Sequence, residues 1–326
     1  MSSAEIVEGG LQTTVQDYPG RRGMLAKGFF PAGPMDHFAH RAANVLVGNP
    51  ESAATLEITL GNFRIRFDEE ATVAVCGAEA PVAVGGEEVA LWESHRVPPG
   101  AEVSIGIAPV RGFRLYLAVA GGFDVPELFG SRATYTMGAL GGHEGRSLQA
   151  GDRLPIGAAN GVAAGRRFGK DTVPAHNRQW EVRAMRGPQA TPDFLTEADM
   201  ETLFGREWTI DRNSNRTGIR LESHKFEWAR ESGGIAGGHP SNILDNSYPV
   251  GAININGDLP VILGPDGPTA GGFVVAATVI HADFWKIGQF RPVGDTVRFR
   301  EVSIDEAIDA ERALADSLGE SNLESS

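Results

Sequence analysis

Three stretches of this 326-residue chain concentrate glycine, asparagine, aspartate and arginine, and they cover residues 14–36, 211–221 and 233–273. Amide side chains and exposed loop backbone both donate and accept hydrogen bonds, so they suit a neutral ligand that carries N–H and C=O groups. An arginine guanidinium adds a planar, two-pronged donor for a carboxylate. The chemistry that these residues favour is therefore recognition of an amide together with a carboxyl group.

Each of these residues also has a purely structural interpretation. Asn and Gly build tight turns, and Arg216 and Arg220 could be charges at the end of a strand that face solvent. The clustering favours the functional interpretation of the set as a whole. For any single residue, both interpretations stay open.

Several familiar catalytic motifs are absent from the sequence. It has no Gly-x-x-x-x-Gly-Lys-Ser/Thr phosphate loop, no dinucleotide fingerprint after a predicted strand and no Gly-x-Ser-x-Gly elbow. The histidines show no His-Glu-x-x-His zinc spacing. His37 and His40 stand three residues apart on a predicted helix, and we expect them to be solvated surface residues rather than metal ligands. The sequence thus predicts no metal site.

Composition and charge narrow the class of protein further. Lys and Arg number 29 against 42 Asp and Glu, and the net charge of −13 argues against nucleic acid or an anionic membrane as a partner. The single cysteine, Cys76, permits no disulfide within the chain and points to a reducing compartment. No apolar run approaches the roughly 20 residues of a membrane-spanning helix, and the N-terminal residues lack the pattern of a secretory signal. We therefore expect a cytoplasmic protein.

The elements that must position the polar stretches are predicted to be mainly β-strands. Apolar and polar residues alternate at a period of two over residues 56–60, 63–67, 72–75, 103–107 and 113–117, and β-type sequence returns from 180 to 300. Short helices are expected behind the capping Asp36, from about Pro192, and behind a capping box of Ser303 and Glu306. The 42 glycines and 19 prolines, which follow no fixed period, are also typical of a turn-rich β protein.

The length of the chain favours two domains, each a β-barrel or a β-sandwich. We expect the first domain over residues 1–157, a linker over 158–177, the second domain over 178–302, and a C-terminal helix and tail over 303–326. The linker is placed where Gly, Ala and charged residues replace the alternating pattern.

Long motifs in and between the polar stretches resemble the KipA family, also labelled allophanate hydrolase subunit 2 or biotin-dependent carboxyltransferase. These motifs are residues 15–23, 34–36, 116–124, 130–134, 141–152 and 215–220. Within that family, residues 213–218, 238–242, 256–268 and 284–289 are most similar to the carboxyltransferase region of urea carboxylase. One departure is Gly267-Pro-Thr-Ala-Gly-Gly-Phe273, where urea carboxylases tend to have Gly-Pro-Ser-Leu-Gly-Gly-Phe.

The resemblance implies a mainly β fold of two cyclophilin-like β-barrel domains with a few short helices. It also implies a subunit that transfers CO2 from carboxybiotin to urea or a urea-like amide. The partners would be a KipI-like protein, similar to allophanate hydrolase subunit 1, and a biotin carboxylase and carrier protein that holds the biotin. The chain has no Met-Lys-Met biotin attachment motif and is too short to add an ATP-grasp domain, so we expect it to be inactive alone.

Two alternatives stay open within the same resemblance. One is a subunit of an ATP-dependent 5-oxoprolinase, whose acceptor is a cyclic amide with a carboxylate. The other is a KipA-type regulator that binds a kinase and performs no chemistry.

If the chain is a carboxyltransferase, its candidate catalytic residues are Arg216, Asn215 and Asp266. Arg216 would hold the transferring carboxylate, and Asp266 would orient the acceptor nitrogen or accept its proton. The candidate substrate-binding residues are Asn213, Arg220, His239, Ser241, Asn242, Gly271 and Gly272. Among them, Arg220 would share the carboxylate, Asn213 would bind amide groups with Asn215, and the two glycines would let the ligand approach the backbone closely.

Overall fold

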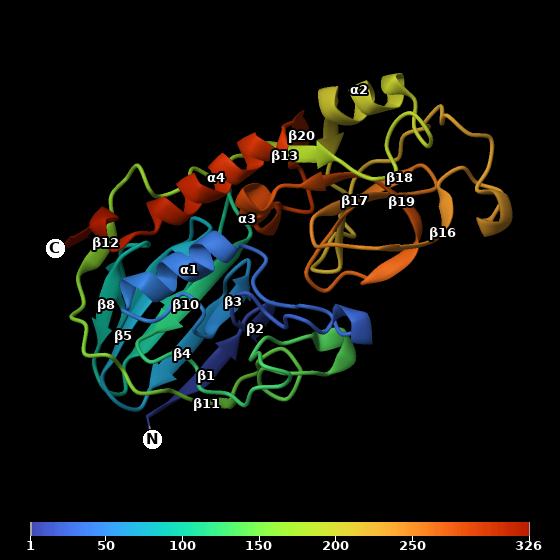
Figure 1. The fold of residues 1–326 in the computed structure, drawn as a ribbon. Helices are drawn as coiled ribbons and strands as arrows, with labels where there is room; N and C mark the ends of the chain where they lie inside the picture. Colours follow the sequence, from blue (N-terminus) through green and yellow to red (C-terminus); the bar gives the residue numbers. More distant parts are fainter. Residues whose placement is uncertain (1, 326) are drawn as a thin grey trace. The chain divides into compact units, whose positions relative to one another are not determined.

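A computed structural model describes residues 2–325, and it confirms a mainly β protein with few helices (Figure 1). The chain divides into two compact units. Unit 1 comprises Met1–Met24, Pro31–His176 and Ala315–Ser326, and unit 2 comprises Leu25–Phe30 and Asn177–Leu314. The C-terminal residues thus return to unit 1, where the strand β21 (Leu323–Ser325) pairs with β12 (Arg166–Phe168) inside the predicted linker.

Unit 1 is built from two antiparallel sheets. One has six strands in the order β11-β1-β4-β9-β6-β7, and the other has five in the order β2-β3-β10-β5-β8. The strands are β1 (Ser3–Gly9), β2 (Gln12–Gln16), β3 (Thr55–Thr59), β4 (Phe63–Phe67), β5 (Ala71–Gly77), β6 (Val82–Val84), β7 (Glu87–Val89), β8 (Ser94–Val97), β9 (Glu102–Ile105), β10 (Arg114–Val119) and β11 (Arg153–Pro155).

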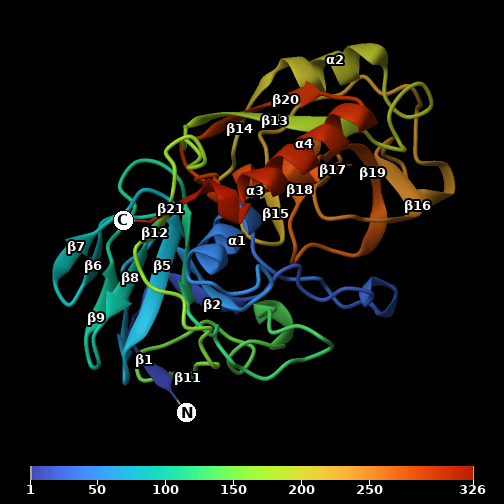
Figure 2. The ribbon, with the colours of Figure 1, turned by 60° about the vertical axis from the view of Figure 1, so that its left-hand side comes forward.

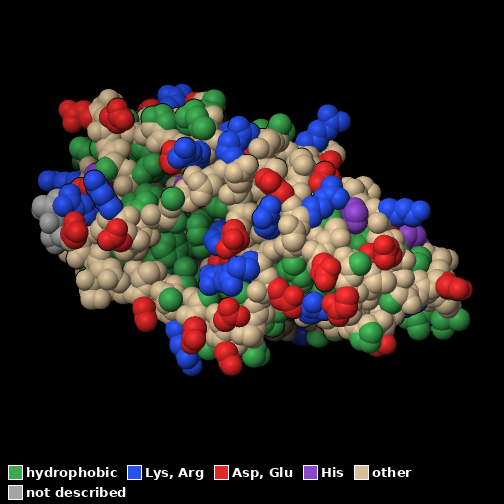
Figure 3. Space-filling model, turned by 90° about the horizontal axis from the view of Figure 1, so that it is seen from above, with side chains coloured by type: hydrophobic (Ala, Val, Ile, Leu, Met, Phe, Trp, Pro, Cys, Tyr) green, Lys and Arg blue, Asp and Glu red, His purple; other side chains and the backbone are tan. Residues whose placement is uncertain are grey.

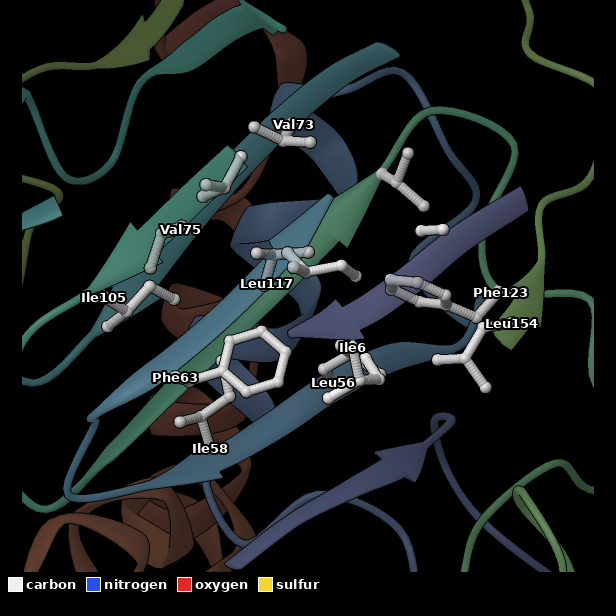
Figure 4. Close-up of a cluster of buried hydrophobic side chains, with 14 of the residues drawn as sticks. Ile6, Leu56, Ile58, Phe63, Val73, Val75, Ile105, Leu117, Phe123 and Leu154 are labelled. Atoms are coloured by element: carbon white, nitrogen blue, oxygen red, sulfur yellow. The ribbon is translucent and has the colours of Figure 1, made fainter. Parts of the chain in front are cut away.

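One apolar core joins the two sheets of unit 1 (Figure 4). In β4, Phe63, Ile65 and Phe67 are buried and alternate with the more exposed Arg64 and Arg66, as the period of two predicts. The strands β3 and β10 are buried on both faces because the helix α1 (His37–Leu46) covers the side of their sheet away from the core. Each fully buried aromatic or aliphatic side chain contributes about 1.5–3 kcal/mol, so this core dominates the stability of the unit.

The helix α1 begins where the sequence predicts, but its histidines are not on the surface. The Asp36 carboxylate accepts a hydrogen bond from Ala39 N at 2.8 Å and caps the helix. His37 and His40 are buried, so the expectation of solvated side chains was wrong: α1 packs against the sheet with this side inward. His40 Nδ1 lies 2.8 Å from Thr55 Oγ1, and burial lowers the pKa of His40 to about 3. His40 is therefore a neutral core residue.

Unit 2 is a sheet that closes on itself (Figure 2). Its order is β14-β20-β13-β19-β17-β18-β15, with β16 paired to β19. The strands are β13 (Gln179–Arg186), β14 (Glu207–Thr209), β15 (Gly218–Arg220), β16 (Asn242–Ser247), β17 (Ala252–Asn256), β18 (Leu259–Leu263), β19 (Ala270–Val279) and β20 (Thr296–Glu301). A bridge between Ile210 and Leu221, flanked by hydrogen bonds from Asp211 N to Arg220 O and from Glu222 N to Thr209 O, joins the two outermost strands. The result is a closed barrel.

Three helices accompany the barrel strands. The helix α2 (Glu197–Gly205) begins later than the expected Pro192, because Thr196 and Asp199 form a reciprocal capping box. The helix α3 (His281–Gln289) was not predicted from the sequence. The helix α4 (Ile304–Ser317) confirms the Ser303–Glu306 capping box. Over the described residues, no helix combines the length and apolar character needed to cross a membrane.

Candidate functional site

An open pocket of about 370 Å³ lies on the wall of the unit 2 barrel, over β15, β17, β18 and β19. Successive residues of a strand point to opposite faces. The residues that line the pocket, such as Arg220, Asn254 and Val261, therefore share the face opposite to the fully buried isoleucines Ile253 and Ile262. The two isoleucines pack into the core of the barrel, and the other face of the same strands forms the wall of the pocket.

The pocket combines a cation, two amides and a phenol with an apolar wall. Arg220 is exposed, and its Nη1 donates to Asn213 O at 2.6 Å. Asn254 and Asn256 stand two residues apart on β17 and both line the pocket. The Tyr248 hydroxyl donates to Phe273 O at 3.0 Å and accepts from Phe273 N at 2.7 Å, while burial raises the pKa of this tyrosine. The polar groups suit a carboxylate and an amide, and the apolar wall is lined by Leu259, Val261, Leu263 and Phe273.

The two candidate glycines both line this pocket, but they differ in what occupies their side-chain space. A Cβ atom on Gly271 would lie 2.7 Å from Cε2 of Tyr248. On Gly272 the nearest atom would be Ile243 O, at 3.1 Å. The missing side chain of Gly271 therefore makes room for the Tyr248 ring, and the missing side chain of Gly272 makes room for the carbonyl oxygen of Ile243.

Arg216 and Asp266 bind each other. Arg216 Nε donates to Asp266 Oδ2 at 2.8 Å and Nη2 to Oδ1 at 2.9 Å, and both residues are buried. Neither lines the pocket, whereas Thr217, next to Arg216, and Pro268, two residues after Asp266, both do. The ion pair thus fastens the turn at 264–267 to the loop that leads into β15.

The asparagines before β15 shape their own loop. Asn213 N and Nδ2 both donate to Asp211 Oδ1, at 2.7 and 2.8 Å. Asn215 Oδ1 accepts from Thr217 N at 2.8 Å. These are the local side-chain to backbone bonds by which Asn builds turns. Both residues are exposed, and the loop that they shape carries Arg216 and leads to Arg220.

His239, Ser241 and Asn242 form a separate cluster that does not line the pocket. Ser241 is fully buried, and its Oγ accepts from Gly257 N at 3.0 Å and lies 2.9 Å from His239 Nδ1. Asn242 begins β16 opposite Phe273 of β19. The structure therefore brings Arg220, Gly271 and Gly272 together in one pocket and pairs Arg216 with Asp266 beside it. Asn213 and Asn215 shape the loop before β15, and His239, Ser241 and Asn242 lie elsewhere in the barrel.

Tyr248, Asn254, Asn256 and Thr217 also line the pocket and were not among the candidate residues. A signal for two of them exists in the sequence. In Asn254-Ile-Asn256 the period of two places both amides on one face of a strand and the isoleucine on the other. Tyr248 carries no such signal, because its place depends on the pairing of β16 with β19.

Residues of the first polar stretch (14–36) take part in a buried hydrogen-bond network in unit 1. Glu57 Oε2 accepts from Met35 N at 2.8 Å and from the Tyr116 hydroxyl at 2.7 Å, and that hydroxyl accepts from Asp36 N. Burial raises the pKa of Tyr116, and the neighbouring Glu57 carboxylate adds to the shift. Gln16 Oε1 accepts from Gly33 N at 3.0 Å. This buried network fixes the segment that leads into α1.

Neither the charges on the face seen in Figure 3 nor the metal-ligating side chains among residues 2–325 point to a further site. On the face seen in Figure 3, Asp and Glu side chains are interspersed with Lys and Arg, so this face carries no basic patch. Within residues 2–325, no three His, Cys, Asp or Glu side chains are grouped so that they could hold a metal ion.

Comparison with known proteins shows which family and which proteins this chain resembles. Residues 27–301 match the family model described as "Carboxyltransferase domain, subdomain A and B". The urea amidolyase of Lachancea kluyveri is 40% identical over 309 residues, which are 92% of this chain and 17% of that protein. A 5-oxoprolinase subunit of Escherichia coli is 33% identical over 94% of this chain and 93% of its own length. The crystal structure of the Kluyveromyces lactis urea carboxylase superimposes with a TM-score of 0.92 at 39% identity, over 97% of this chain and 29% of that chain.

Proposed function

Because this chain belongs to the carboxyltransferase family of subdomains A and B, we propose that it transfers a carboxyl group from carboxybiotin, carried by another protein, to the nitrogen of urea or a urea-like amide. The observation that supports this most is the pocket, in which the Arg220 guanidinium lies with the amides of Asn254 and Asn256. A KipI-like subunit and a biotin carboxylase and carrier protein would complete the enzyme. The chain spans 17% and 25% of two urea-processing relatives, so most of their length has no counterpart in it.

The donor set of the pocket fits a carboxylated ureido group. Carboxybiotin, when bound, supplies an activated carboxyl group. The Arg220 fork would hold the carboxylate, and the Asn254 and Asn256 amides would donate to ureido or amide oxygen and accept from N–H. The apolar wall would keep water from the carboxyl group during transfer. We assign Arg216 and Asp266 to positioning: their ion pair holds the loops on which Thr217 and Pro268 line the pocket.

A second candidate is a subunit of a 5-oxoprolinase. It is favoured by the comparison with the 5-oxoprolinase subunit of E. coli, because the match covers 94% of this chain and 93% of that protein. The acceptor would be a cyclic amide that carries a carboxylate. Such a ligand would use Arg220 for its carboxylate and the apolar wall for its ring carbons, whereas urea has no carbon chain to place there.

Reconstitution with its natural partners tests these proposals. A tagged copy is purified from its source, and its partners are identified. ATP hydrolysis by the assembled complex is then measured with urea and with 5-oxoproline. Carboxyltransferase function predicts a biotinylated partner and urea-dependent turnover, whereas the second candidate predicts a hydrolase partner and 5-oxoproline-dependent turnover. A complex that contains a histidine kinase and turns over neither compound would replace both with the regulatory alternative.

A further inference from the structure

Asn254 is a buried amide in the wall of the barrel pocket. Its exposed fraction is 5%, whereas Asn256, which lines the same pocket from the same strand, is exposed. The pairing of β17 with β19 shifts beside it, since Ile253 lies opposite Ala277 and Asn254 lies opposite Val275. Such β-bulges redirect side chains and are common next to active sites. A buried polar side chain at a bulge therefore calls for a ligand or a partner that uses it.

The Tyr248 hydroxyl determines which end of this amide faces the pocket, because the two side chains are hydrogen-bonded. A phenol has one proton to donate, and the Tyr248 hydroxyl donates it to Phe273 O at 3.0 Å. Toward Asn254 the hydroxyl can therefore only accept, so the Asn254 side chain presents its NH2 group to it. The pKa of Tyr248 is raised by burial, and the hydrogen bonds from Phe273 N and from the Asn254 side chain oppose that rise, as donated bonds must.

The carbonyl oxygen of Asn254 is then left for a ligand. With Nδ2 on Tyr248, Oδ1 lies on the side of the amide away from that hydroxyl, and it accepts no hydrogen bond from any residue in the described part of the chain. The fully buried side-chain atoms that lack a partner include none of Asn254, so Oδ1 keeps surface that faces the pocket. An amide oxygen with unused lone pairs favours an N–H group of a ligand over an oxygen atom.

From these contacts we infer that Asn254 is the residue that selects an N–H group in the ligand, and that Tyr248 is a positioning residue that orients its amide. The ligand class is an amide or urea with an unsubstituted N–H and a carboxylate in the same molecule, the carboxylate being held by Arg220. An ester, lactone or carbonate of the same shape would place an oxygen atom against Asn254 Oδ1, and two acceptors form no hydrogen bond. The inference rests on the proposed function in that it concerns the same pocket.

Two matched pairs of ligands test the selection by isothermal titration calorimetry on the purified full chain. One pair is 2-oxoimidazolidine-4-carboxylate and 2-oxo-1,3-dioxolane-4-carboxylate, and the other is 5-oxoproline and 5-oxotetrahydrofuran-2-carboxylate. The members of a pair share ring size and carboxylate and differ only in that N–H is replaced by oxygen. We expect the oxygen member to bind about 10- to 100-fold more weakly, because Asn254 Oδ1 would lose its hydrogen bond. Equal affinities within a pair, or no binding of either N–H ligand, overturns the inference.

Three variants assign the preference for N–H to particular residues. Asn254→Leu keeps the size of the side chain but removes the oxygen, so the preference should fall to about twofold or less. Tyr248→Phe keeps the ring beside Gly271 and removes the hydroxyl, so the amide is free to turn and the preference should fall in the same direction. Arg220→Gln is the matched control: both members of a pair should lose affinity alike, and the preference should stay. A preference that survives in Asn254→Leu or in Tyr248→Phe overturns the assignment of that residue.

Failure of this inference and failure of the proposed function give different results. The ligand pairs are measured on the unaltered isolated chain without carboxybiotin, so the outcome depends neither on turnover nor on the folding of a variant. Carboxyl transfer is measured on the reconstituted complex. A preference for N–H in a chain whose complex transfers no carboxyl group supports the inference and overturns the proposed function. Transfer activity in a complex whose chain binds both members of each pair equally overturns the inference alone.

Discussion

The Arg216 guanidinium donates to both carboxylate oxygens of Asp266, although the two residues are 50 positions apart in the chain. Asp266 N also donates to Arg216 O at 3.2 Å, so side chains and backbone hold the two loops together. The geometry is the bidentate arrangement that arginine and carboxylates favour. With both prongs of the fork on Asp266, positioning of the pocket rim is the role that we assign to this pair.

Loss of the arginine should therefore cost stability. Arg216→Met leaves the Asp266 carboxylate buried without its partner, and we expect the free energy of unfolding to fall by about 3–5 kcal/mol, measured by urea denaturation. The double variant Arg216→Met with Asp266→Leu should recover most of that loss, because it removes both charges. Arg220→Met, at an exposed position, should change stability by about 0.5 kcal/mol or less. A stable Arg216→Met that lost only transfer activity would return Arg216 to the role of carboxylate ligand.

Substitution of Arg220 should lower the activity of the complex and leave the stability of the chain unchanged. Arg220→Lys keeps the positive charge but loses the planar fork, so kcat/KM of the reconstituted complex should fall about 10- to 150-fold if a charge-assisted hydrogen bond of about 1.5–3 kcal/mol is lost. The melting temperature should not change, because the side chain is exposed. Equal activity of Arg220→Lys and the unaltered complex would remove the guanidinium from carboxylate binding.

Gly271 should be sensitive to a single methyl group. A Cβ atom at this position would lie 2.7 Å from the Tyr248 ring, and Gly271→Ala is expected to destabilise the chain by about 1–3 kcal/mol in chemical denaturation. Gly205→Ala is the matched control, since a Cβ atom there meets nothing within 4 Å. If both variants unfolded at the same urea concentration, the Tyr248 ring would not be packed tightly against Gly271.

Two buried histidines should make unit 1 sensitive to acid. Burial lowers the pKa of His40 to about 3 and that of His176 to about 4, against an ordinary value of 6.5. Below pH 6.5 the unfolded chain binds protons that the folded chain does not, so stability should decline as the pH falls from about 6.5 to 4. Each histidine should contribute about 1.4 kcal/mol per pH unit. His40→Gln should remove its share of the slope, and an unchanged slope in that variant would contradict a neutral, buried His40.

The chain by itself should neither hydrolyse ATP nor carboxylate urea. Its sequence contains no phosphate-binding loop and no biotin attachment motif. The check is a coupled assay on homogeneous protein, with the reconstituted complex as the positive control. Turnover by the isolated chain would exclude its being only a subunit.

Features that depend on neighbouring residues could be predicted from the order of the amino acids. The alternation of Phe63, Ile65 and Phe67 predicted β4, and the capping residues Asp36 and Ser303 predicted where α1 and α4 begin. These signals are local, because a strand period and a helix cap involve residues within four positions of one another. The family resemblance was equally accessible, since its motifs are continuous segments of the chain.

Which polar residues contact one another depends on how distant segments of the chain pack. Arg216 and Arg220 are four residues apart and equally basic, yet one is buried against Asp266 and the other lines the pocket. The antiparallel pairing of β15 with β18 determines this difference, because it brings residues 264–267 against the loop before β15. His40 became a core residue for a similar reason: the face that α1 buries is chosen by the sheet on which it packs. Burial and pairing over 50 or more residues depend on how distant segments pack, and no local pattern in the sequence records that.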